Sequence, residues 1–171
     1  MKDSCCSYCG TKLYNLSYPK RCSNCKEYAW GNPIPVVVAL MPVDQNGKWG
    51  ILIQQRNIEP EKGNWALTGG YINHGEDWRT AITREVKEEL NLDAEPNKFQ
   101  LFDIVSGKSG ATLLVICYYN NVIPFEMLSS FTPNDEVQAV DVMWEPRELA
   151  FPAHTKAAFD ALMIHKQYLE D

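Results

Sequence analysis

The sequence predicts an α/β layered domain that carries a small cysteine-rich unit at its N-terminal end. Five of the six cysteines lie within the first 25 residues, in a polar stretch without long apolar runs. From Val36 onward, short apolar runs of strand length alternate with turn residues, and two longer segments repeat their apolar residues at helical spacing. Strands mixed with at least two helices are typical of a layered α/β domain.

The expected elements follow a boundary at "GNPIP" (31–35), where a glycine and two prolines interrupt regular structure. This boundary separates a unit over residues 1–32 from a domain over 33–171. The expected strands are residues 36–43, 48–56, 65–72, 98–107, 111–123 and 137–145, and the third of them breaks at its glycines. An Asn-Gly pair in "DQNG" favours a tight turn after the first strand. The expected helices are residues 76–90 and 153–169.

Composition and charge limit the possible partners of the protein. The chain has 171 residues, of which 45% are hydrophobic, which suffices for a sizeable core. The net charge of −6 disfavours a general affinity for the nucleic acid backbone, so we expect no nucleic acid partner. No stretch approaches the 18 apolar residues typical of a membrane span, and no apolar run follows the first residue. We therefore expect no membrane association, no signal peptide and a cytoplasmic location.

Two CxxC pairs, Cys6–Cys9 and Cys22–Cys25, are separated by twelve residues. Four thiolates from two such turns complete the tetrahedral shell that Zn²⁺ accepts, with no position left open for chemistry. The spacing therefore predicts a structural zinc ribbon. Disulfides are the alternative, which a reducing cytosol disfavours, and iron can also occupy four thiolates. The neighbouring Cys5 could replace Cys6 as the first ligand.

Three carboxylates lie within one turn of the helix predicted over residues 76–90. Glu85 and Glu89 continue the apolar row that should pack on the sheet, and Glu88 lies beside them. That row consists of Trp78, Ala81 and Ile82. The pair at i, i+4 costs roughly 0.2–0.5 kcal/mol of helix stability, and partial burial adds to this cost. A hard divalent cation such as Mg²⁺ or Mn²⁺ would offset both costs. The alternative is a solvated helix stabilised by pairs such as Arg84–Glu88.

The sequence around this helix resembles the Nudix box, G-x5-E-x7-R-E-U-x-E-E-x-G-U, in which U is aliphatic. The matching positions are Gly70, Glu76, Arg84, Glu85, Val86, Glu88, Glu89 and Leu92. Asn91 stands where the family usually has glycine, a mild departure because asparagine tolerates the same left-handed backbone. Upstream, "GNWALTGG" is similar to the family's G-x-W-x-L-P-G-G segment, with Thr68 in place of proline.

The resemblance implies a Nudix α/β/α sandwich with a mixed sheet, and metal-dependent hydrolysis of a nucleoside diphosphate linked to another moiety. By this resemblance Glu85, Glu88 and Glu89 hold Mg²⁺ or Mn²⁺, and Gly69 adds a carbonyl. Arg84 would orient the glutamates. By the same resemblance, Glu76 would support the loop before the helix. The residues that would contact the substrate are Arg56, Gly69 and Gly70.

A general base outside the box is common in the family and comes from the loop before the last strand. Here that loop offers Asp135 and Glu136, and we expect Glu136 to be the base, although an ordinary solvated acid is the alternative. Arg56 could equally be a plain surface arginine. The three histidines, His74, His154 and His165, are expected to be structural or solvent-facing rather than catalytic.

A zinc ribbon ahead of a Nudix domain is similar to the NADH pyrophosphatases and to a related group that acts on ADP-ribose or FAD. The S-Q-P-W-P-F-P motif of the NADH pyrophosphatases is absent from residues 100–120. Gly107 and Lys108 stand where many ADP-ribose hydrolases have proline, and the tyrosine typical of diadenosine polyphosphate hydrolases is missing. The resemblance therefore implies a dinucleotide substrate such as ADP-ribose, FAD or NADH without choosing among them.

Three alternatives remain open at the level of sequence. The protein could be a nucleoside triphosphate pyrophosphohydrolase, or a non-catalytic nucleotide-sensing regulator that uses its ribbon to bind nucleic acid. Such regulators usually lose box glutamates, whereas all are present here. A zinc-ribbon adaptor for RNA or DNA is disfavoured by the net charge. Related proteins with a ribbon often form homodimers, so a homodimer is also expected.

Overall fold

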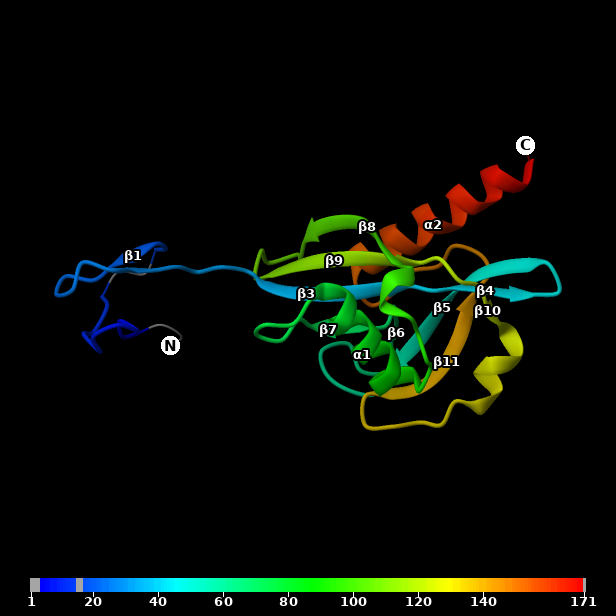
Figure 1. Cartoon of the computed structure of the whole chain (residues 1–171), viewed down its shortest axis with the longest axis horizontal. Helices are drawn as coiled ribbons and strands as arrows, with labels where there is room; N and C mark the ends of the chain where they lie inside the picture. Colours follow the sequence, from blue (N-terminus) through cyan, green and yellow to red (C-terminus); the bar gives the residue numbers. More distant parts are fainter. Residues whose placement is uncertain (1–3, 15–16, 171) are drawn as a thin grey trace. The chain divides into compact units, whose positions relative to one another are not determined.

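The computed structural model of the protein describes residues 4–14 and 17–170, and its description of side chains ends at residue 164. The chain divides into two compact units, Met1–Pro33 and Ile34–Asp171, whose elements are labelled in Figure 1. The first unit holds a two-stranded antiparallel ribbon of β1 (Lys20–Arg21) and β2 (Tyr28–Ala29). Among the described residues, no helix is both long and apolar enough to cross a membrane.

Two mixed sheets form the centre of the second unit. Its strands are β3 (Ile34–Leu40), β4 (Pro42–Gln45), β5 (Lys48–Arg56), β6 (Trp65–Ala66), β7 (Gly69–Tyr71), β8 (Phe99–Ser106), β9 (Thr112–Tyr119), β10 (Ile123–Pro124) and β11 (Val137–Met143). One sheet has the order β7-β3-β9-β8, and the other has the order β10-β4-β5-β11 with β6 paired to β5. The pairs β3–β9 and β4–β10 are parallel and the other pairs antiparallel, so the predicted mixed α/β arrangement is confirmed.

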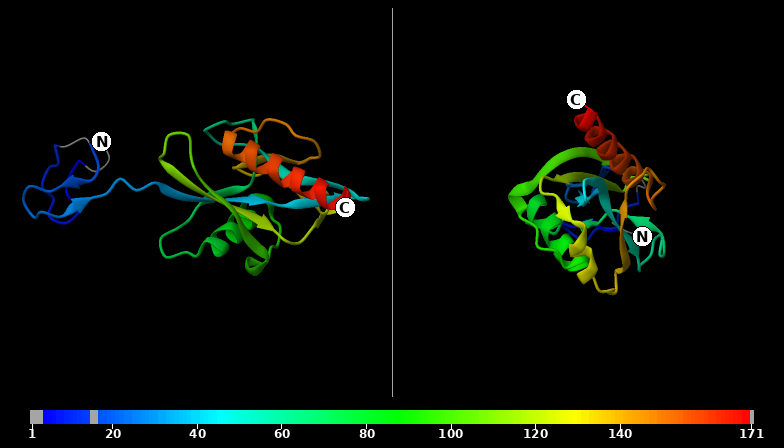
Figure 2. Two further views of the ribbon diagram at one scale, coloured as in Figure 1. Left: turned by 90° about the horizontal axis from the view of Figure 1, so that it is seen from above. Right: turned by 90° about the vertical axis from the view of Figure 1, so that its right-hand side faces the viewer.

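The two α-helices, α1 (Trp78–Leu90) and α2 (Pro152–Glu170), cover opposite faces of the sheet that contains β3 (Figures 1 and 2). The described residues also form the 3-10 helices η1 (Pro96–Lys98) and η2 (Phe125–Ser130). Val37 and Ala39 of β3 pack in a core with α1, whereas Val38 and Leu40 pack in a second core with α2. Because successive strand residues point to opposite faces, one strand contributes to both cores, as expected for an α/β/α sandwich.

The first helix begins two residues later than its sequence pattern indicates. Glu76 was expected in the first helical turn, but it lies in the preceding loop. Asp77 has extended dihedrals and caps the helix by accepting a hydrogen bond from the amide of Arg79. The expected end is confirmed, because Asn91 adopts the left-handed conformation (φ 54°) and its amide donates to the Lys87 carbonyl.

Three strand predictions were wrong in their boundaries, one of them because the run 111–123 ends as β9 at Tyr119 and Ile123 already belongs to β10 of the other sheet. The run 36–43 is not one strand, because the chain leaves the first sheet after Leu40 and joins the second at Pro42. Apolar side chains keep alternating through this crossing, since Met41 and Val43 share the α1 core with Val37, and alternation does not reveal a change of hydrogen-bonding partner. The glycines at 69 and 70 do not break a strand. They form β7, which pairs with β3.

Candidate functional site

A cleft of about 1200 Å³ lies in the second unit. Eight residues that the sequence singled out line it: Arg56, Gly69, Gly70, Arg84, Glu85, Glu88, Glu89 and Glu136. They come from the end of β5, from β7, from α1 and from the residue before β11. The cleft is therefore lined by four segments that are distant in sequence: the end of a strand, a strand of glycines, one face of a helix and a loop.

Arg84 is the centre of the ionic network on this wall. Its Nε and Nη2 atoms bind both carboxylate oxygens of Glu76 at 2.9 and 3.0 Å. Its Nη1 atom binds Glu85 at 2.7 Å and Glu88 at 3.0 Å, and Nη2 also donates to the Tyr71 carbonyl at 3.0 Å. The guanidinium lowers the pKa of the Glu76 carboxyl through this pair of hydrogen bonds. One side chain thus fixes the helix, the loop before it and strand β7 to one another.

Glu85 and Glu89 are buried, with only 8% and 4% of their surface exposed. The Glu89 Oε2 atom accepts hydrogen bonds from Gln54 Nε2 at 2.8 Å and from the Gly69 amide at 3.0 Å. Burial nevertheless raises the pKa of Glu89 to about 8, and it also raises the pKa of Glu85 against the opposing effect of Arg84. Loss of hydration is therefore the dominant electrostatic effect at these carboxylates, and a bound cation would compensate it.

Gln54 is a residue of this site that the sequence analysis missed. It is 1% exposed, and its amide binds Glu89 on one side and accepts from the Thr68 hydroxyl at 3.0 Å on the other. Gln54 follows the buried residues of β5, and a polar residue in such a run was the signal that could have found it. Its two hydrogen bonds fix the rotamer of a carboxylate that lines the cleft.

The two glycines of β7 are required by close contacts rather than by flexibility. A Cβ atom on Gly69 would lie 2.1 Å from the Val37 carbonyl oxygen, and one on Gly70 would lie 2.4 Å from Glu85 Oε1. Their absence of side chains lets β7 approach both β3 and the glutamate face of α1.

Replacing Gly70 with alanine is expected to lower kcat on the order of 10²-fold, because the new methyl group must displace the Glu85 carboxylate. Steady-state kinetics of the variant measures the effect. The unfolding temperature in magnesium-free buffer serves as the control, since a local displacement leaves the two cores intact. A variant with wild-type kcat would show that the position of Glu85 is unimportant.

Asn134 places Glu136 at the cleft. Its Nδ2 atom donates to the Glu89 carbonyl at 3.0 Å, and its Oδ1 atom accepts from the amides of Glu136 at 3.0 Å and Val137 at 2.8 Å. This asparagine therefore ties the loop before β11 to the end of α1. Of the two acids considered for this loop, Glu136 is the one that lines the cleft. Its charge contributes to the raised pKa of both buried glutamates.

The donor set of α1 fits a divalent cation such as Mg²⁺ or Mn²⁺ by its chemistry. Glu85, Glu88 and Glu89 offer hard oxygen atoms, two of them from buried carboxylates, on the wall of an open cleft. In the described part of the chain, only the cysteine cluster brings three or more ligand atoms within 4.8 Å of one another. The three carboxylates are less tightly gathered, and Arg84 binds Glu85 and Glu88 through one nitrogen atom, Nη1.

Arg56 and the histidines named from the sequence differ in their exposure and in whether they line the cleft. Arg56 lines the cleft, donates to the Pro60 carbonyl at 2.8 Å and lies 5.3 Å from the centre of the Phe151 ring. His74 is exposed. His154 is buried and its Nδ1 atom accepts a hydrogen bond from the Leu67 amide. The side chain of His165 lies outside the described residues.

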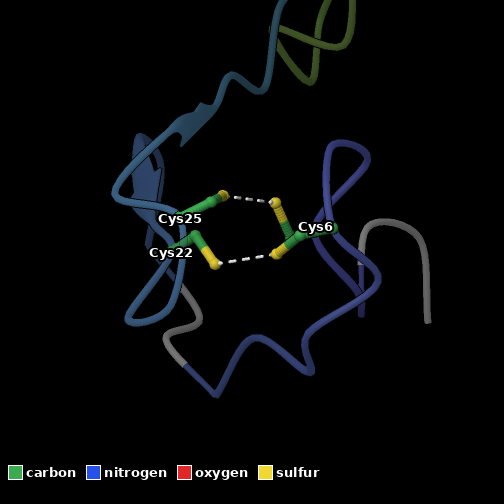
Figure 3. A group of neighbouring side chains, drawn as sticks. Cys6, Cys22 and Cys25 are labelled. Carbon is green, nitrogen blue, oxygen red and sulfur yellow. Dashed lines mark hydrogen bonds between the residues drawn. The ribbon is translucent and has the colours of Figure 1, made fainter.

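The four cysteines predicted as ligands converge in the first unit. The sulfur atoms of Cys6, Cys9, Cys22 and Cys25 all lie within 4.8 Å of one another, and Cys5 is not part of the cluster (Figure 3). The Cys6–Cys25 and Cys9–Cys22 sulfur distances are 3.5 and 3.6 Å. A tetrahedron of 2.3 Å zinc–sulfur bonds has edges of about 3.8 Å, so the cluster is consistent with a structural zinc site.

Both CxxC turns have the same local geometry. After each pair, the next residue has a positive φ, 71° at Gly10 and 67° at Lys26. Its amide donates to the carbonyl of the first cysteine, Cys6 or Cys22, at 2.9 and 3.1 Å. This matched geometry makes each turn present two thiol groups to the same side.

The purified protein is expected to contain one zinc ion per chain, and the Cys22→Ser variant is expected to lose it. Cys22 is 1% exposed, so its loss removes a ligand from the interior of the cluster. Elemental analysis with a colorimetric zinc assay measures the stoichiometry. Cys5→Ser is the matched control and should retain the ion. Equal zinc content in both variants would contradict the assignment, and iron in place of zinc would correct the metal.

The fold and the glutamate-bearing helix together define a Nudix-type protein. A family model described as the NUDIX domain matches residues 33–167, and the chain belongs to this family. A curated CTP pyrophosphohydrolase of Escherichia coli (strain K12) is 34% identical over 67 residues. These residues are 39% of this chain and 47% of that protein, so the match spans about half the length of the relative. The family and this relative support a hydrolase acting on phosphorus-containing anhydrides.

Solved structures with the same fold include two of particular interest. A NUDIX hydrolase from Nitrosomonas europaea superposes with a TM-score of 0.70 at 20% identity, covering 96% of this chain and 93% of that one. The NUDIX domain of Shewanella oneidensis NrtR, solved in complex with ADP ribose, has a TM-score of 0.53 at 18% identity, covering 81% and 87% of the two chains. At these identities the likeness concerns the fold alone.

Proposed function

We propose that this protein hydrolyses the pyrophosphate bond of a nucleoside diphosphate linked to another moiety, such as ADP-ribose, FAD or NADH, and releases a nucleoside monophosphate. The observation that carries the proposal is the size of the cleft beside the complete glutamate set. Its volume of about 1200 Å³ exceeds the roughly 300–1000 Å³ typical of pockets for drug-sized ligands, which leaves room for a second moiety beyond the scissile bond.

In this proposal the glutamates Glu85, Glu88 and Glu89 and the Gly69 carbonyl hold Mg²⁺ or Mn²⁺. When bound, such ions would activate a water molecule and neutralise the charge that develops on the pyrophosphate. Arg84 keeps the helix carboxylates oriented, since it binds two of them directly. Its own orientation is fixed in turn by Glu76, through both carboxylate oxygens.

Two further residues complete the proposed chemistry. Glu136 lines the same cleft as the buried glutamates and is our candidate to take the proton of the attacking water. Arg56 offers a fixed cation on the cleft wall for a substrate phosphate or base, with its Nε atom bound to the Pro60 carbonyl.

A nucleoside triphosphate pyrophosphohydrolase is the second candidate. The 34% identity with the Escherichia coli CTP pyrophosphohydrolase favours it, although that match covers only 39% of this chain. The nucleotide-sensing regulator is less well supported, because the complete glutamate set of the box is present on the cleft wall.

The test is a substrate panel with the wild type and the Glu88→Gln variant in Mg²⁺ or Mn²⁺, with products identified by mass. The panel holds ADP-ribose, FAD, NADH, NAD⁺, diadenosine polyphosphates and nucleoside triphosphates. Release of a monophosphate from a dinucleotide by the wild type alone is the expected result. Cleavage of triphosphates only would favour the second candidate. Binding of nucleotides without any cleavage would favour the regulator.

A further inference from the structure

His154 lies in the wall of the cleft, at the start of α2, on a different element from the glutamates of α1. Only 6% of its surface is exposed, and its Nδ1 atom accepts a hydrogen bond from the Leu67 amide at 3.2 Å. A neutral imidazole has one N–H, and a nitrogen that accepts a hydrogen bond cannot carry it. The proton of the neutral ring is therefore on Nε2.

The ring stays neutral at physiological pH. Burial lowers the pKa of His154 to about 3, and the positive charge of Arg56 contributes to the same shift. Protonation would also place a second N–H against the Leu67 amide, which is itself a donor. His154 is consequently a fixed neutral hydrogen-bond donor, unlike a histidine that exchanges protons during catalysis.

Among the described side chains, those of residues 4–14 and 17–164, the Nε2–H group has no hydrogen-bond partner. The one hydrogen bond of the His154 side chain there is that from the Leu67 amide, and no buried side-chain nitrogen or oxygen lacks a partner. The Nε2 atom must then belong to the small exposed part of the ring. Because His154 lines the cleft, its donor is available to a ligand in that space.

The surroundings of this donor suit a flat heteroaromatic ring. The Phe151 ring lies 4.9 Å from the imidazole at an angle of 63°, and it also lines the cleft. Pro152, Ala153 and Ala157 add small apolar surfaces to the same wall. An aromatic ring, an apolar wall and one hydrogen-bond donor match a nucleobase, which needs a stacking surface and offers acceptor atoms on its edge.

The chain connects this wall directly to the glutamates. Leu67 binds His154 through its amide, and two residues later the Gly69 amide binds Glu89. Two residues span at most about 7 Å even when fully extended. A base held at His154 and a phosphate held at Glu89 would therefore be positioned by one short segment.

We propose that His154 is a specificity residue of the cleft, whose Nε2–H donates a hydrogen bond to an acceptor atom on the nucleobase of the bound nucleotide. Phe151 supplies the adjoining aromatic surface for the base. The proposal names the recognition element for the nucleotide half of the substrate, and so rests on the proposed function only in requiring a nucleotide ligand.

Two substitutions separate the two nitrogens of the ring. In His154→Asn, the amide oxygen can take the place of Nδ1 and still accept from Leu67, while the donor at Nε2 is lost. In His154→Gln, the longer side chain can return an N–H to the Nε2 position, while the acceptor for Leu67 is lost. His74→Asn, at an exposed histidine that does not line the cleft, is the matched control.

The experiment is calorimetric binding of AMP, GMP, CMP, UMP and the base-free ribose 5-phosphate, without divalent metal. In the wild type we expect at least one nucleotide to bind more tightly than ribose 5-phosphate. His154→Asn should lower the affinity for that nucleotide about tenfold without lowering the affinity for ribose 5-phosphate, because one hydrogen bond to the base is lost. His154→Gln should retain part of the preference and show a lower unfolding temperature. His74→Asn should behave as the wild type.

A structural role alone would predict a different pattern. In that case each substitution would weaken the binding of nucleotides and of ribose 5-phosphate equally. The loss of binding would be larger in His154→Gln than in His154→Asn. Either that pattern, or a wild type that binds no monophosphate better than ribose 5-phosphate, would overturn the proposal. The assay needs no hydrolysis. A protein that cleaves no dinucleotide yet shows the His154-dependent preference would disprove the proposed function alone.

Discussion

Replacing Glu89 with glutamine is expected to lower kcat on the order of 10³-fold and, at the same time, to stabilise the metal-free protein. Glu89 is a proposed metal ligand, and loss of one such carboxylate would remove several kcal/mol of transition-state stabilisation, where about 1.4 kcal/mol corresponds to each factor of ten. The amide oxygen of glutamine can still accept the hydrogen bonds from Gln54 and Gly69. Replacing this buried carboxyl should therefore lower kcat strongly without unfolding the protein.

The gain in stability has a defined pH dependence. The pKa of Glu89 is raised from its ordinary 4.5 to about 8 by burial, so the folded protein binds this proton more tightly than the unfolded chain does. The contribution of Glu89 to the stability of the wild type is therefore fully present below pH 4.5 and is lost as the pH rises toward 8. Glutamine has no such loss, so the variant should be more stable by about 4 kcal/mol near pH 8 and by little near pH 4.5.

Denaturant unfolding at several pH values in magnesium-free buffer measures this difference. Glu88→Gln is the matched control, because Glu88 is exposed and its carboxylate bears no comparable desolvation cost. It should lose activity with little change in stability. A Glu89→Gln variant that is less stable than the wild type at pH 8 would show that the buried carboxylate is compensated by the protein itself.

Replacing Arg84 with alanine is expected to lower kcat by a similar factor, on the order of 10³, and to destabilise the protein. The substitution removes five hydrogen bonds, four to carboxylates and one to the Tyr71 carbonyl. It leaves the buried Glu85 without its cation, which costs more than the loss of an exposed ion pair. Since the Arg84 side chain is itself 26% exposed, we expect a loss of about 2 kcal/mol rather than the larger values of fully buried pairs.

Arg84→Lys distinguishes charge from geometry at this position. Lysine keeps the positive charge but cannot bind both oxygens of Glu76 while also reaching Glu85 and Glu88. Kinetics and unfolding of both variants should place lysine between alanine and the wild type, with stability recovered more fully than kcat. Full recovery of kcat by lysine would show that the ordering of the carboxylates depends on charge alone.

The features of the site that could be predicted from sequence are the local ones. The row formed by Ala81, Ile82, Glu85 and Glu89 follows from helical spacing within nine residues, and the structure buries all four on one face. The paired CxxC turns are equally local. The spacing of a motif fixes such arrangements because the backbone of a helix or a tight turn leaves the side chains few alternative positions.

The residues that sequence reasoning missed, Gln54 and Asn134, act across long separations. Gln54 contacts Glu89 from 35 positions away, and Asn134 contacts the end of the same helix from 45. The contact of His154, a residue expected to be structural or solvent-facing, reaches Leu67 across 87 positions. These contacts depend on which strands become neighbours, and periodicity carries no information about that. For the same reason the crossing at Met41 from one sheet to the other was read as a continuous strand.

The segment from Leu67 to Gly69 sets the spacing between two contacts of the cleft wall. One amide is bound to the imidazole of His154 and the other to the carboxylate of Glu89, so neither contact can shift along the cleft without the other. Under the proposed function, a base held at His154 would select the bond to be cleaved by its distance from that base, whatever group is attached beyond it. Inserting a single residue between Leu67 and Gly69 would then change this distance, and with it the bond that is hydrolysed.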